Sequence, residues 1–312
     1  MITTLAGGVG AARFLQGLVH VVPPEEIVTI VNTGDDIEFY GLHISPDVDI
    51  VTYTLAGIVD EEKGWGIRGD TFNCLDMLRK YGYETWFMLG DKDLATHIHR
   101  TLLLKSGLKL SEVTEKIRKA LGVKVKIIPM TDDRVQTKIV TNVGEMHFQE
   151  YLVKRKTQDP VLGVKFEGIE RAEPAPGVIE AILNANGIII CPSNPIVSIG
   201  PILSIKGVRE ALKKTKAKTV AISPIVGGAP IKGPADKLMR GLGIEVSALG
   251  VAKIYKDFLD TLIIDNVDRD LKPRIEEIGV KVHVTNTIMK TLQNKMKLAK
   301  ETLKLLELKQ YL

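Results

Sequence analysis

Short apolar segments that alternate with segments of helical spacing constrain the fold of this chain more than any other feature. Residues 2–5 and 27–31 are predicted strands, and residues 11–21 between them have the spacing of a helix. The alternation returns in the second half of the chain, where strands are predicted over residues 187–191, 219–222, 261–264 and 280–284. Buried strands that alternate with helices are typical of a doubly wound, mostly parallel sheet, so we predict an α/β fold.

The middle of the chain has a different pattern. Two segments of helical spacing are followed by two runs of alternating polarity, at residues 94–104, 111–121, 124–128 and 137–141. We therefore predict that residues 90–157 form a smaller inserted α+β subdomain or lid. The core is then formed by residues 1–89 together with residues 158–312.

Composition and charge argue against several classes of partner. The net charge is +4 and no dense basic block with interleaved aromatic residues is present, so nucleic acid is not an expected partner. The two cysteines, Cys74 and Cys191, have no zinc-binding spacing, which favours a reduced, cytoplasmic setting. No segment has the length and hydropathy of a membrane span and no export signal is visible, so no membrane partner is expected.

A glycine-rich turn follows the first predicted strand. Gly7, Gly8 and Gly10 allow backbone N–H groups at a helix N-terminus to approach an anion, and Arg13 adds a cation nearby. The dinucleotide-binding fingerprint is incomplete, because Arg13 replaces its last glycine and Asn32 stands where an acid would hold a ribose. We predict that the turn binds phosphate. The alternative is a turn that only tightens the joint between strand and helix.

Carboxylates cluster directly after the second predicted strand, where open α/β sheets bind ligands. The cluster consists of Asp35, Asp36, Asp47 and Asp49. Such a cluster needs a counter-charge, so we predict that Asp35, Asp47 and Asp49 bind Mg²⁺ together with phosphate oxygens. The alternative places Asp35 and Asp36 in a surface turn and makes Asp47 a helix cap. It leaves Asp49 without a basic partner in the adjacent turn.

Three further side chains are predicted to contact a substrate. Trp65 lies in a glycine-rich loop, where it either stacks on a flat ring or pins the loop to the core. Lys92 follows Asp91, which we expect to cap the next helix, and supplies a cation. His97 and His99 lie on different faces of that helix, so they cannot both line one site. A surface or packed role is the default for both histidines, and His97 is the favoured contact.

Two later strands also end in unusual turns. Ser193 and Asn194 stand between two prolines after one strand, and Ser223 and Gly227 belong to a proline- and glycine-rich turn after the next. The carboxyl ends of parallel strands meet at one edge of a sheet, so these turns should converge with the glycine turn and the acidic loop. The four residues, together with Asn32, are predicted nucleotide contacts.

Several segments, taken in order, form a specific combination of motifs: residues 7–10, 32–36, 44–49, 64–66, 70–72, 89–97, 192–196 and 223–230. This combination resembles the 2-phospho-L-lactate transferase family, and the resemblance runs from residue 1 to at least residue 262. That family makes the deazaflavin coenzyme F-420. Its members transfer a phospholactyl group from lactyl-diphospho-guanosine to the ribityl hydroxyl of the deazaflavin Fo, release GMP and require Mg²⁺. Homologues use phosphoenolpyruvyl or phosphoglyceryl donors, so the acyl group stays open.

The resemblance implies a Rossmann-like core with a smaller subdomain, an archaeal source and a homodimer. It implies two small-molecule substrates, Fo and a guanosine diphosphate ester. Asp49 and Lys92 match positions that contact Fo, with Trp65 and His97 beside them. Some members carry Arg in place of Lys92, and a lysine cannot make the same bidentate contacts. We expect Asp49, with Asp35, to orient or deprotonate the attacking hydroxyl, unless Asp49 is a metal ligand instead.

Two other classes of protein compete with this interpretation. Nucleotide-sugar-binding regulatory proteins share the fold and the glycine turn but have no transferase activity. The segment 45–49 and the Trp65 loop argue against them. An NAD-dependent oxidoreductase is disfavoured by Arg13 and Asn32, which interrupt the fingerprint.

Overall fold

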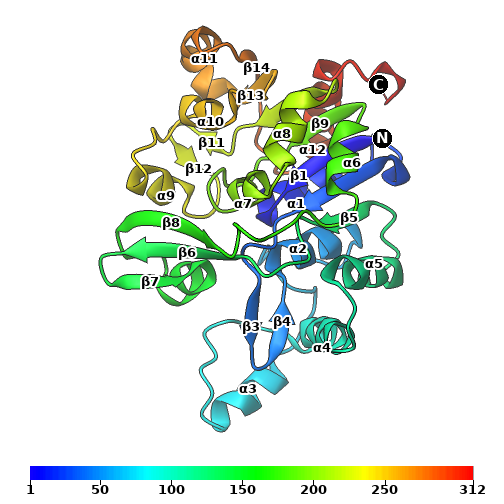
Figure 1. The fold of residues 1–312 in the computed structure, drawn as a ribbon, viewed down its shortest axis with the longest axis vertical. Coiled ribbons are helices and arrows are strands. Elements are labelled where there is room, and N and C mark those ends of the chain that lie inside the picture. The colour runs from blue at the N-terminus through cyan, green and yellow to red at the C-terminus, as the bar shows by residue number, and fades with distance from the viewer. Residues whose placement is uncertain (312) are drawn as a thin grey trace.

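The computed structural model, which describes residues 1–311, contains a seven-stranded sheet in which all neighbouring strands are parallel (Figure 1). In spatial order the strands are β14 (Lys281–Thr285), β13 (Thr261–Asp265), β10 (Lys218–Ile222), β9 (Gly187–Ile190), β1 (Ile2–Ala6), β2 (Ile27–Val31) and β5 (Lys126–Pro129). The strand order reverses direction between β1 and β9, which is the switch point where doubly wound sheets bind ligands. The predicted α/β fold class is confirmed.

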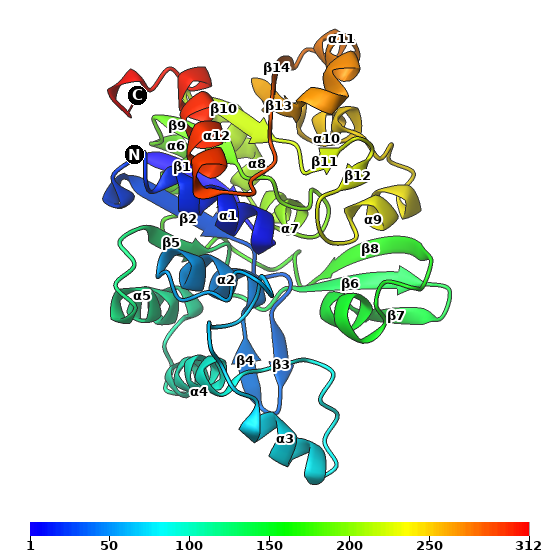
Figure 2. The ribbon, with the colours of Figure 1, turned by 180° about the vertical axis from the view of Figure 1, so that it is seen from behind.

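Two hydrophobic clusters cover the two faces of this sheet. Successive strand side chains point to opposite faces, so Ile189 joins one cluster while Ile188 and Ile190 join the other. The face of Ile189 is covered by α1 (Gly8–Leu18), α2 (Pro46–Leu55) and α12 (Leu292–Leu305), which Figure 2 shows from behind. The opposite face is covered by α6 (Val178–Leu183), α7 (Ile199–Ser204), α8 (Val208–Lys214), α10 (Ala248–Tyr255) and α11 (Lys272–Glu277).

Smaller elements extend from the sheet beside the carboxyl ends of its strands (Figure 1). An antiparallel sheet has the order β7 (Gly144–His147), β6 (Gln136–Thr141) and β8 (Val161–Glu167). Two hairpins are formed by β3 (Ile37–Phe39) with β4 (Leu42–Ile44) and by β11 (Ile225–Val226) with β12 (Ala229–Pro230). The remaining helices are α3 (Asn73–Lys80), α4 (Asp91–Lys105), α5 (Leu110–Ala120) and α9 (Ala235–Gly241). Short helical turns complete the chain at Pro24–Glu26, Glu150–Lys154, Asn266–Leu271 and Lys309–Tyr311.

Strand pairing crosses the boundaries predicted for the inserted subdomain. β5 lies within residues 90–157, yet it pairs in parallel with β2 and forms one edge of the main sheet. β8 lies outside those residues, yet it pairs with β6. The division into residues 90–157 and the rest stays a prediction. The helix expected from about residue 48 begins at Pro46, because proline is well suited to the first helical position. In the described part of the chain, no helix is long and apolar enough to cross a membrane.

Candidate functional site

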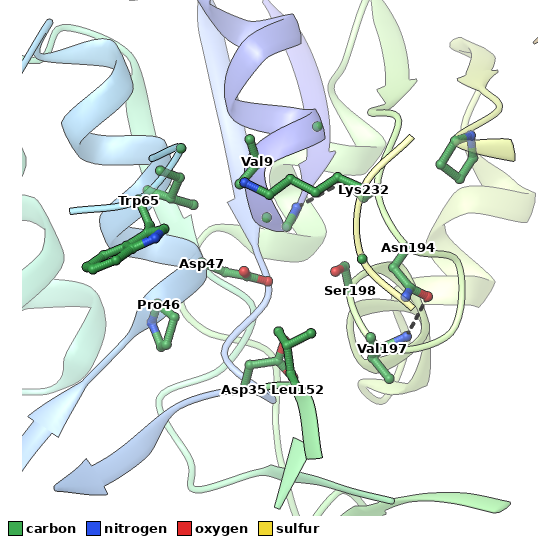
Figure 3. A pocket seen from close by; sticks show the side chains of 18 of the residues that line it. Val9, Asp35, Pro46, Asp47, Trp65, Leu152, Asn194, Val197, Ser198 and Lys232 are labelled. Carbon is green, nitrogen blue, oxygen red and sulfur yellow. Dashed lines mark hydrogen bonds between the residues drawn. The ribbon is translucent and has the colours of Figure 1, made fainter. Parts of the chain in front are cut away.

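A cavity of about 560 Å³ lies at the carboxyl ends of β1, β2, β9 and β10 (Figure 3). Gly8, Asp49 and Asn194 share this cavity although they are far apart in the sequence. The predicted site residues that line it are Gly7, Gly8, Gly10, Arg13, Asp35, Asp47, Asp49, Trp65, His97, Ser193, Asn194 and Ser223. Among residues 1–311, the predicted residues Asn32, Lys92 and Gly227 are not part of its lining.

The glycine-rich turn packs against the turn that follows β9. The N–H of Gly7 donates a hydrogen bond to Ser193 Oγ over 3.2 Å. A Cβ at Gly10 would lie 2.1 Å from the carbonyl oxygen of Pro192, so only glycine allows this close approach. Gly8 has a φ of +70°, which also favours glycine. The turn therefore presents the N-terminus of α1 to the cavity, where backbone N–H groups and the helix dipole attract anions.

Asn32 and Gly227 do not line the cavity, and both make hydrogen bonds to other parts of the protein. The Asn32 amide donates to Asp47 Oδ2 over 2.9 Å and to the carbonyl oxygen of Val197 over 3.2 Å. Asn32 is fully buried, so it joins the acidic loop to the chain segment after β9. The Gly227 N–H donates to the Asp268 carboxylate.

Asp35 and Asp47 are buried carboxylates on the cavity wall. Burial raises the pKa of Asp47 to about 6. Burial, and then the charge of Asp47, hold the pKa of Asp35 well above its usual value. Asp35 Oδ1 makes no hydrogen bond to any residue that the structure describes. A divalent cation fits this pair, because it would neutralise both carboxylates and coordinate an oxygen that is otherwise unpartnered.

The metal donors available from the protein are few. Over residues 1–311, no group of three or more His, Cys, Asp or Glu side chains is arranged to hold a metal ion. A Mg²⁺ ion beside Asp35 and Asp47 would therefore need further oxygen ligands from phosphate or water. Mg²⁺ commonly binds in this way, with one or two carboxylates and substrate phosphates.

Asp49 has a basic partner, Arg100, that the sequence analysis missed. Arg100 Nη1 donates to Asp49 Oδ2 over 3.1 Å, and Nη2 donates to Oδ1. Arg100 is only 1% exposed. Burial opposes its charge, yet the Asp49 carboxylate raises the pKa of the guanidinium above the ordinary value. The sequence analysis looked for a basic residue only in the turn next to Asp49. Arg100 lies in α4, 51 residues later, so it was not considered.

One face of α4 carries Asp93, His97 and Arg100 at helical spacing, and all three side chains are buried. His97 Nδ1 lies 3.2 Å from Arg100 Nη1, and His97 Nε2 lies 3.2 Å from Asp93 Oδ1. Tyr53 of α2 donates its hydroxyl to Asp93 Oδ1 over 2.7 Å. His99 is exposed, which confirms that the two histidines lie on different faces.

The N-termini of α3 and α4 are capped by carboxylates from each other's segments. Asp70, which precedes α3, accepts hydrogen bonds from the first N–H groups of α4, including that of Lys92 over 2.8 Å. Asp91 accepts from the first N–H groups of α3, including that of Cys74 over 3.0 Å. The prediction that Asp91 caps its own helix is therefore wrong, because its carboxylate reaches the neighbouring helix. The Lys92 ammonium donates to the carbonyl oxygen of Gly69 over 3.1 Å.

Trp65 lies on the cavity wall and is 40% exposed. Its ring centroid is 6.4 Å from that of Phe72, and Lys63 Nζ lies 5.8 Å from the indole centroid. Phe148 and Leu152 line the same cavity with apolar surface. This combination of an accessible indole and apolar side chains suits a flat ring.

The turns after β9 and β10 are shaped by their own polar side chains. Asn194 Oδ1 accepts hydrogen bonds from two N–H groups of its turn, including that of Ile196 over 2.9 Å. Ser223 Oγ accepts from the N–H of Ile225 over 3.2 Å. Lys232, which the sequence analysis missed, also lines the cavity. Lys232 and Arg13 together give the cavity wall a positive region. Burial and the nearby charge of Arg13 lower the pKa of Lys232.

Tyr53, Asp93 and Arg100 were likewise missed by the sequence analysis. The spacing of Asp93, His97 and Arg100 along a predicted helix is a signal that would have grouped them on one face. Tyr53 carried no such signal, because its partner Asp93 is 40 residues away.

Comparisons with known proteins identify the family of this chain. The family model described as 2-phospho-L-lactate transferase CofD matches residues 2–303. The 2-phospho-L-lactate transferase of Methanocaldococcus jannaschii is 48% identical over 96% of both chains. The phosphoenolpyruvate transferase of Streptomyces coelicolor is 45% identical over 98% of both chains.

The fold is shared with more distant proteins. A solved protein of the UPF0052 family from Bacillus halodurans superposes with a TM-score of 0.64 and 16% identity, over 97% of this chain and 98% of that one. At this identity the likeness concerns the fold alone. The family match and the close relatives, which span nearly the whole chain, show that this chain belongs to the 2-phospho-L-lactate transferase family.

Proposed function

We propose that this protein transfers a phospholactyl or phosphoenolpyruvyl group from a guanosine diphosphate ester to the ribityl hydroxyl of Fo, with release of GMP. The observation that carries the proposal is the family match over residues 2–303. The protein is accordingly a transferase of coenzyme F-420 biosynthesis. Relatives named for each donor are almost equally similar, so both acyl groups are retained.

The donor is expected to bind on the side of the cavity formed by the glycine-rich turn. The N-terminus of α1 at Gly8, together with Arg13 and Lys232, supplies N–H groups and positive charge for a diphosphate. Ser193 and Asn194 line the cavity beside this turn, and we expect them to contact the nucleotide.

Asp35 and Asp47 are the proposed Mg²⁺ ligands. Both are buried, and the unpartnered Asp35 oxygen supports the assignment. Asp49, which was predicted as a third ligand, has both oxygens bonded to Arg100, so it is not included. When bound, Mg²⁺ would neutralise the charge of the diphosphate and of the departing phosphate.

Fo is expected to bind on the side formed by α2, α4 and the Trp65 loop. Trp65 offers a ring surface, and Asp49 and His97 line the wall beside it. The hydroxyl oxygen of Fo attacks the phosphorus that carries the acyl group, and the bond from that phosphorus to the GMP oxygen breaks. Such a reaction depends mainly on positioning and charge neutralisation, which rigid and buried polar groups supply.

The proposed activity is tested by incubating the protein with Fo, Mg²⁺ and one of three guanosine diphosphate esters, those of lactate, enolpyruvate and glycerate. Mass analysis should show a product of Fo and GMP with the lactate or the enolpyruvate ester. Binding of UDP-sugars without any reaction of Fo would instead support a regulatory protein of the same fold.

The metal assignment is tested by thermal unfolding with GDP, in the presence of Mg²⁺ or of EDTA. Mg²⁺ at about one hundred times its dissociation constant should stabilise the wild-type protein by about 2.7 kcal/mol. Asp35→Asn and Asp47→Asn should lose this stabilisation. Asp257→Asn, which changes a carboxylate paired with Arg209 outside the cavity, should retain it. Full retention in both site variants would refute the assignment.

We also propose that the protein is a homodimer, as the family resemblance implies. Light scattering of the purified protein should give about twice the mass of one chain. A mass equal to one chain at micromolar concentration would contradict this.

A further inference from the structure

The attacking hydroxyl must lose its proton, and two ionisable carboxylates lie on the proposed Fo side of the cavity. They are Asp49 of α2 and Asp93 of α4, and both line the wall. The sequence favours Asp49, but the two carboxylates have different contacts. The question of which one accepts the proton rests on the proposed function above.

Both oxygens of Asp49 are already occupied. Arg100 donates to them, and the pair is almost completely buried, with side-chain exposures of 7% for Asp49 and 1% for Arg100. A substrate hydroxyl could reach an Asp49 oxygen only by displacing Arg100, which leaves a buried guanidinium without its partner. Such a loss is strongly unfavourable.

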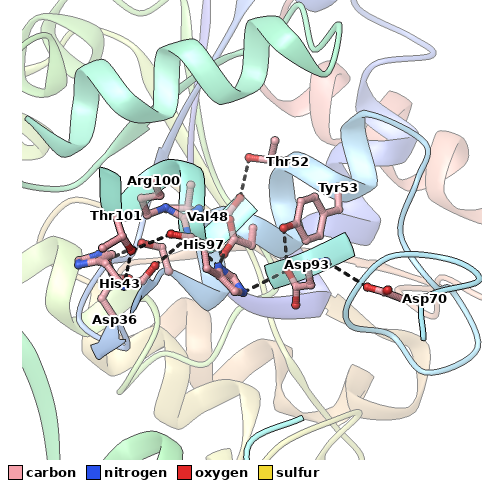
Figure 4. A network of polar contacts seen from close by, with 12 residues as sticks. Asp36, His43, Val48, Thr52, Tyr53, Asp70, Asp93, His97, Arg100 and Thr101 are labelled. Atoms are coloured by element: carbon pink, nitrogen blue, oxygen red, sulfur yellow. Dashed lines mark hydrogen bonds and ion pairs between the residues drawn. The ribbon is translucent and has the colours of Figure 1, made fainter. Parts of the chain in front are cut away.

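Asp93 has one oxygen held and one oxygen free. Its Oδ1 accepts a hydrogen bond from the Tyr53 hydroxyl over 2.7 Å, and His97 Nε2 stands 3.2 Å from the same oxygen. The backbone N–H of Asp93 is fixed by Asp70 over 3.1 Å. Asp93 Oδ2 makes no hydrogen bond within the residues that the structure describes, and the side chain retains 11% exposure at the cavity. The carboxylate is thus oriented through one oxygen, which leaves the other available to a substrate (Figure 4).

His97 is less accessible than Asp93, because its side chain is only 1% exposed. Its Nδ1 stands 3.2 Å from the Arg100 Nη1 donor, and its Nε2 lies 3.2 Å from Asp93 Oδ1 without a hydrogen bond to any residue that the structure describes. Arg100 points a donor at Nδ1, so Nδ1 is the acceptor nitrogen of the ring. His97 therefore acts as a positioning residue for Asp93.

We propose that Asp93 is the general base of the transfer reaction. The bond between the Fo hydroxyl oxygen and the phosphorus forms, and the proton of that hydroxyl passes to Asp93 Oδ2. The bond from the phosphorus to the GMP oxygen breaks, and GMP leaves with the electron pair of that bond. An aspartate plays the same part in protein kinases, where it accepts the proton of a substrate hydroxyl.

The charged and titratable groups that face Asp93 are His97 and Arg100 of α4, Tyr53 and Asp49 of α2, and Asp70 of the preceding loop. Burial raises the pKa of Asp93, but hydrogen bonding and charge from His97, with the Tyr53 hydroxyl, lower it below its ordinary value. The carboxylate is therefore in its ionised, hydrogen-bond-accepting form at neutral pH.

The test compares Asp93→Asn with Asp91→Asn in a single-turnover assay with Fo and the ester that the wild-type protein uses. Asp91 belongs to the same first helical turn, but its carboxylate caps α3 and lies outside the cavity lining. Asp93→Asn should lower the rate of transfer at least 100-fold and leave the KM for Fo within about threefold. Asp91→Asn should keep the wild-type rate and KM.

Tyr53→Phe provides a second variant if Asp93→Asn fails to fold. It removes the hydroxyl that orients the carboxylate, so the rate of transfer should fall about tenfold while the KM for Fo stays within about threefold. A rate of transfer within threefold of wild type for Asp93→Asn, or for Tyr53→Phe where Asp93→Asn does not fold, would overturn the proposal. If the wild-type protein itself transfers nothing to Fo, the proposed function has failed, and this outcome also removes Asp93 from the role.

Discussion

Replacing Arg100 by methionine should leave the Asp49 carboxylate buried without a cation. Arg100 is 1% exposed and donates to both oxygens of Asp49. Removal of one partner from a buried ion pair typically costs about 3–5 kcal/mol, because the remaining charge has lost its solvation and its partner. Methionine is the longest unbranched apolar side chain, so it fills part of the space that the arginine occupied.

The size of the effect sets the assay. The entropy of unfolding is about 0.65 kcal/mol per kelvin for a chain of this length near 60 °C. The expected destabilisation therefore lowers Tm by about 5–8 °C, which differential scanning calorimetry resolves easily. Metal and nucleotide are omitted from the buffer, so that a change in ligand binding does not contribute to Tm.

A second substitution separates the ion pair from a general loss of packing. Asp49→Asn in the Arg100→Met background removes the uncompensated charge and should recover at least about 2 kcal/mol. If the double variant is no more stable than Arg100→Met alone, the cost does not come from a stranded carboxylate and the reasoning is refuted. A fall in Tm of less than 1 °C for Arg100→Met would refute it directly.

Three further predictions concern other parts of the molecule. Burial lowers the pKa of His147 from 6.5 to about 4, so the unfolded chain takes up the proton first and stability is lost as pH falls through this interval. Urea titrations at pH 6.5 and pH 4 should therefore show that the free energy of unfolding falls by about 3 kcal/mol less in His147→Gln than in the wild-type protein. Gly10→Ala places a Cβ 2.1 Å from the Pro192 oxygen, so it should lower the free energy of unfolding by about 1–3 kcal/mol. Gly163→Ala is the control, because the nearest atom to its Cβ would be 3.7 Å away, and it should lower the same quantity by less than about 0.5 kcal/mol. Trp65→Leu should weaken Fo binding about tenfold in equilibrium dialysis and leave GDP binding unchanged; unchanged Fo affinity with lower stability would mean that the indole only pins its loop.

The sequence was sufficient for most strands of the main sheet because each contains a short run dominated by apolar residues. Residues 27–31 are predicted and observed as the same strand, and all five are buried. The partner of a strand is not encoded in its own periodicity, so β5 was assigned to an insertion although it pairs with β2. The start of α2 was placed two residues late, because Asp47 was considered as the cap while Ser45 occupies that position.

The candidate site was predictable where one geometric rule applied. Turns that follow parallel strands meet at one edge of the sheet, so Gly8, Asp35 and Asn194 were expected together and share one cavity. The pairing of Asp49 with Arg100 followed no such rule. It depends on how α4 packs beside α2, and that packing is decided by tertiary contacts that no local pattern reports.

The central position of β1 has a consequence for the order in which the protein is made. β1 lies between β2 and β9, and the Gly7 N–H meets Ser193 across 186 residues of sequence. During synthesis on the ribosome, the first strand therefore lacks one of its neighbours until well over half of the polypeptide has emerged. A nascent chain that stops near residue 150 retains an open hydrogen-bonding edge at β1, which makes it a ready target for chaperones and for mispairing.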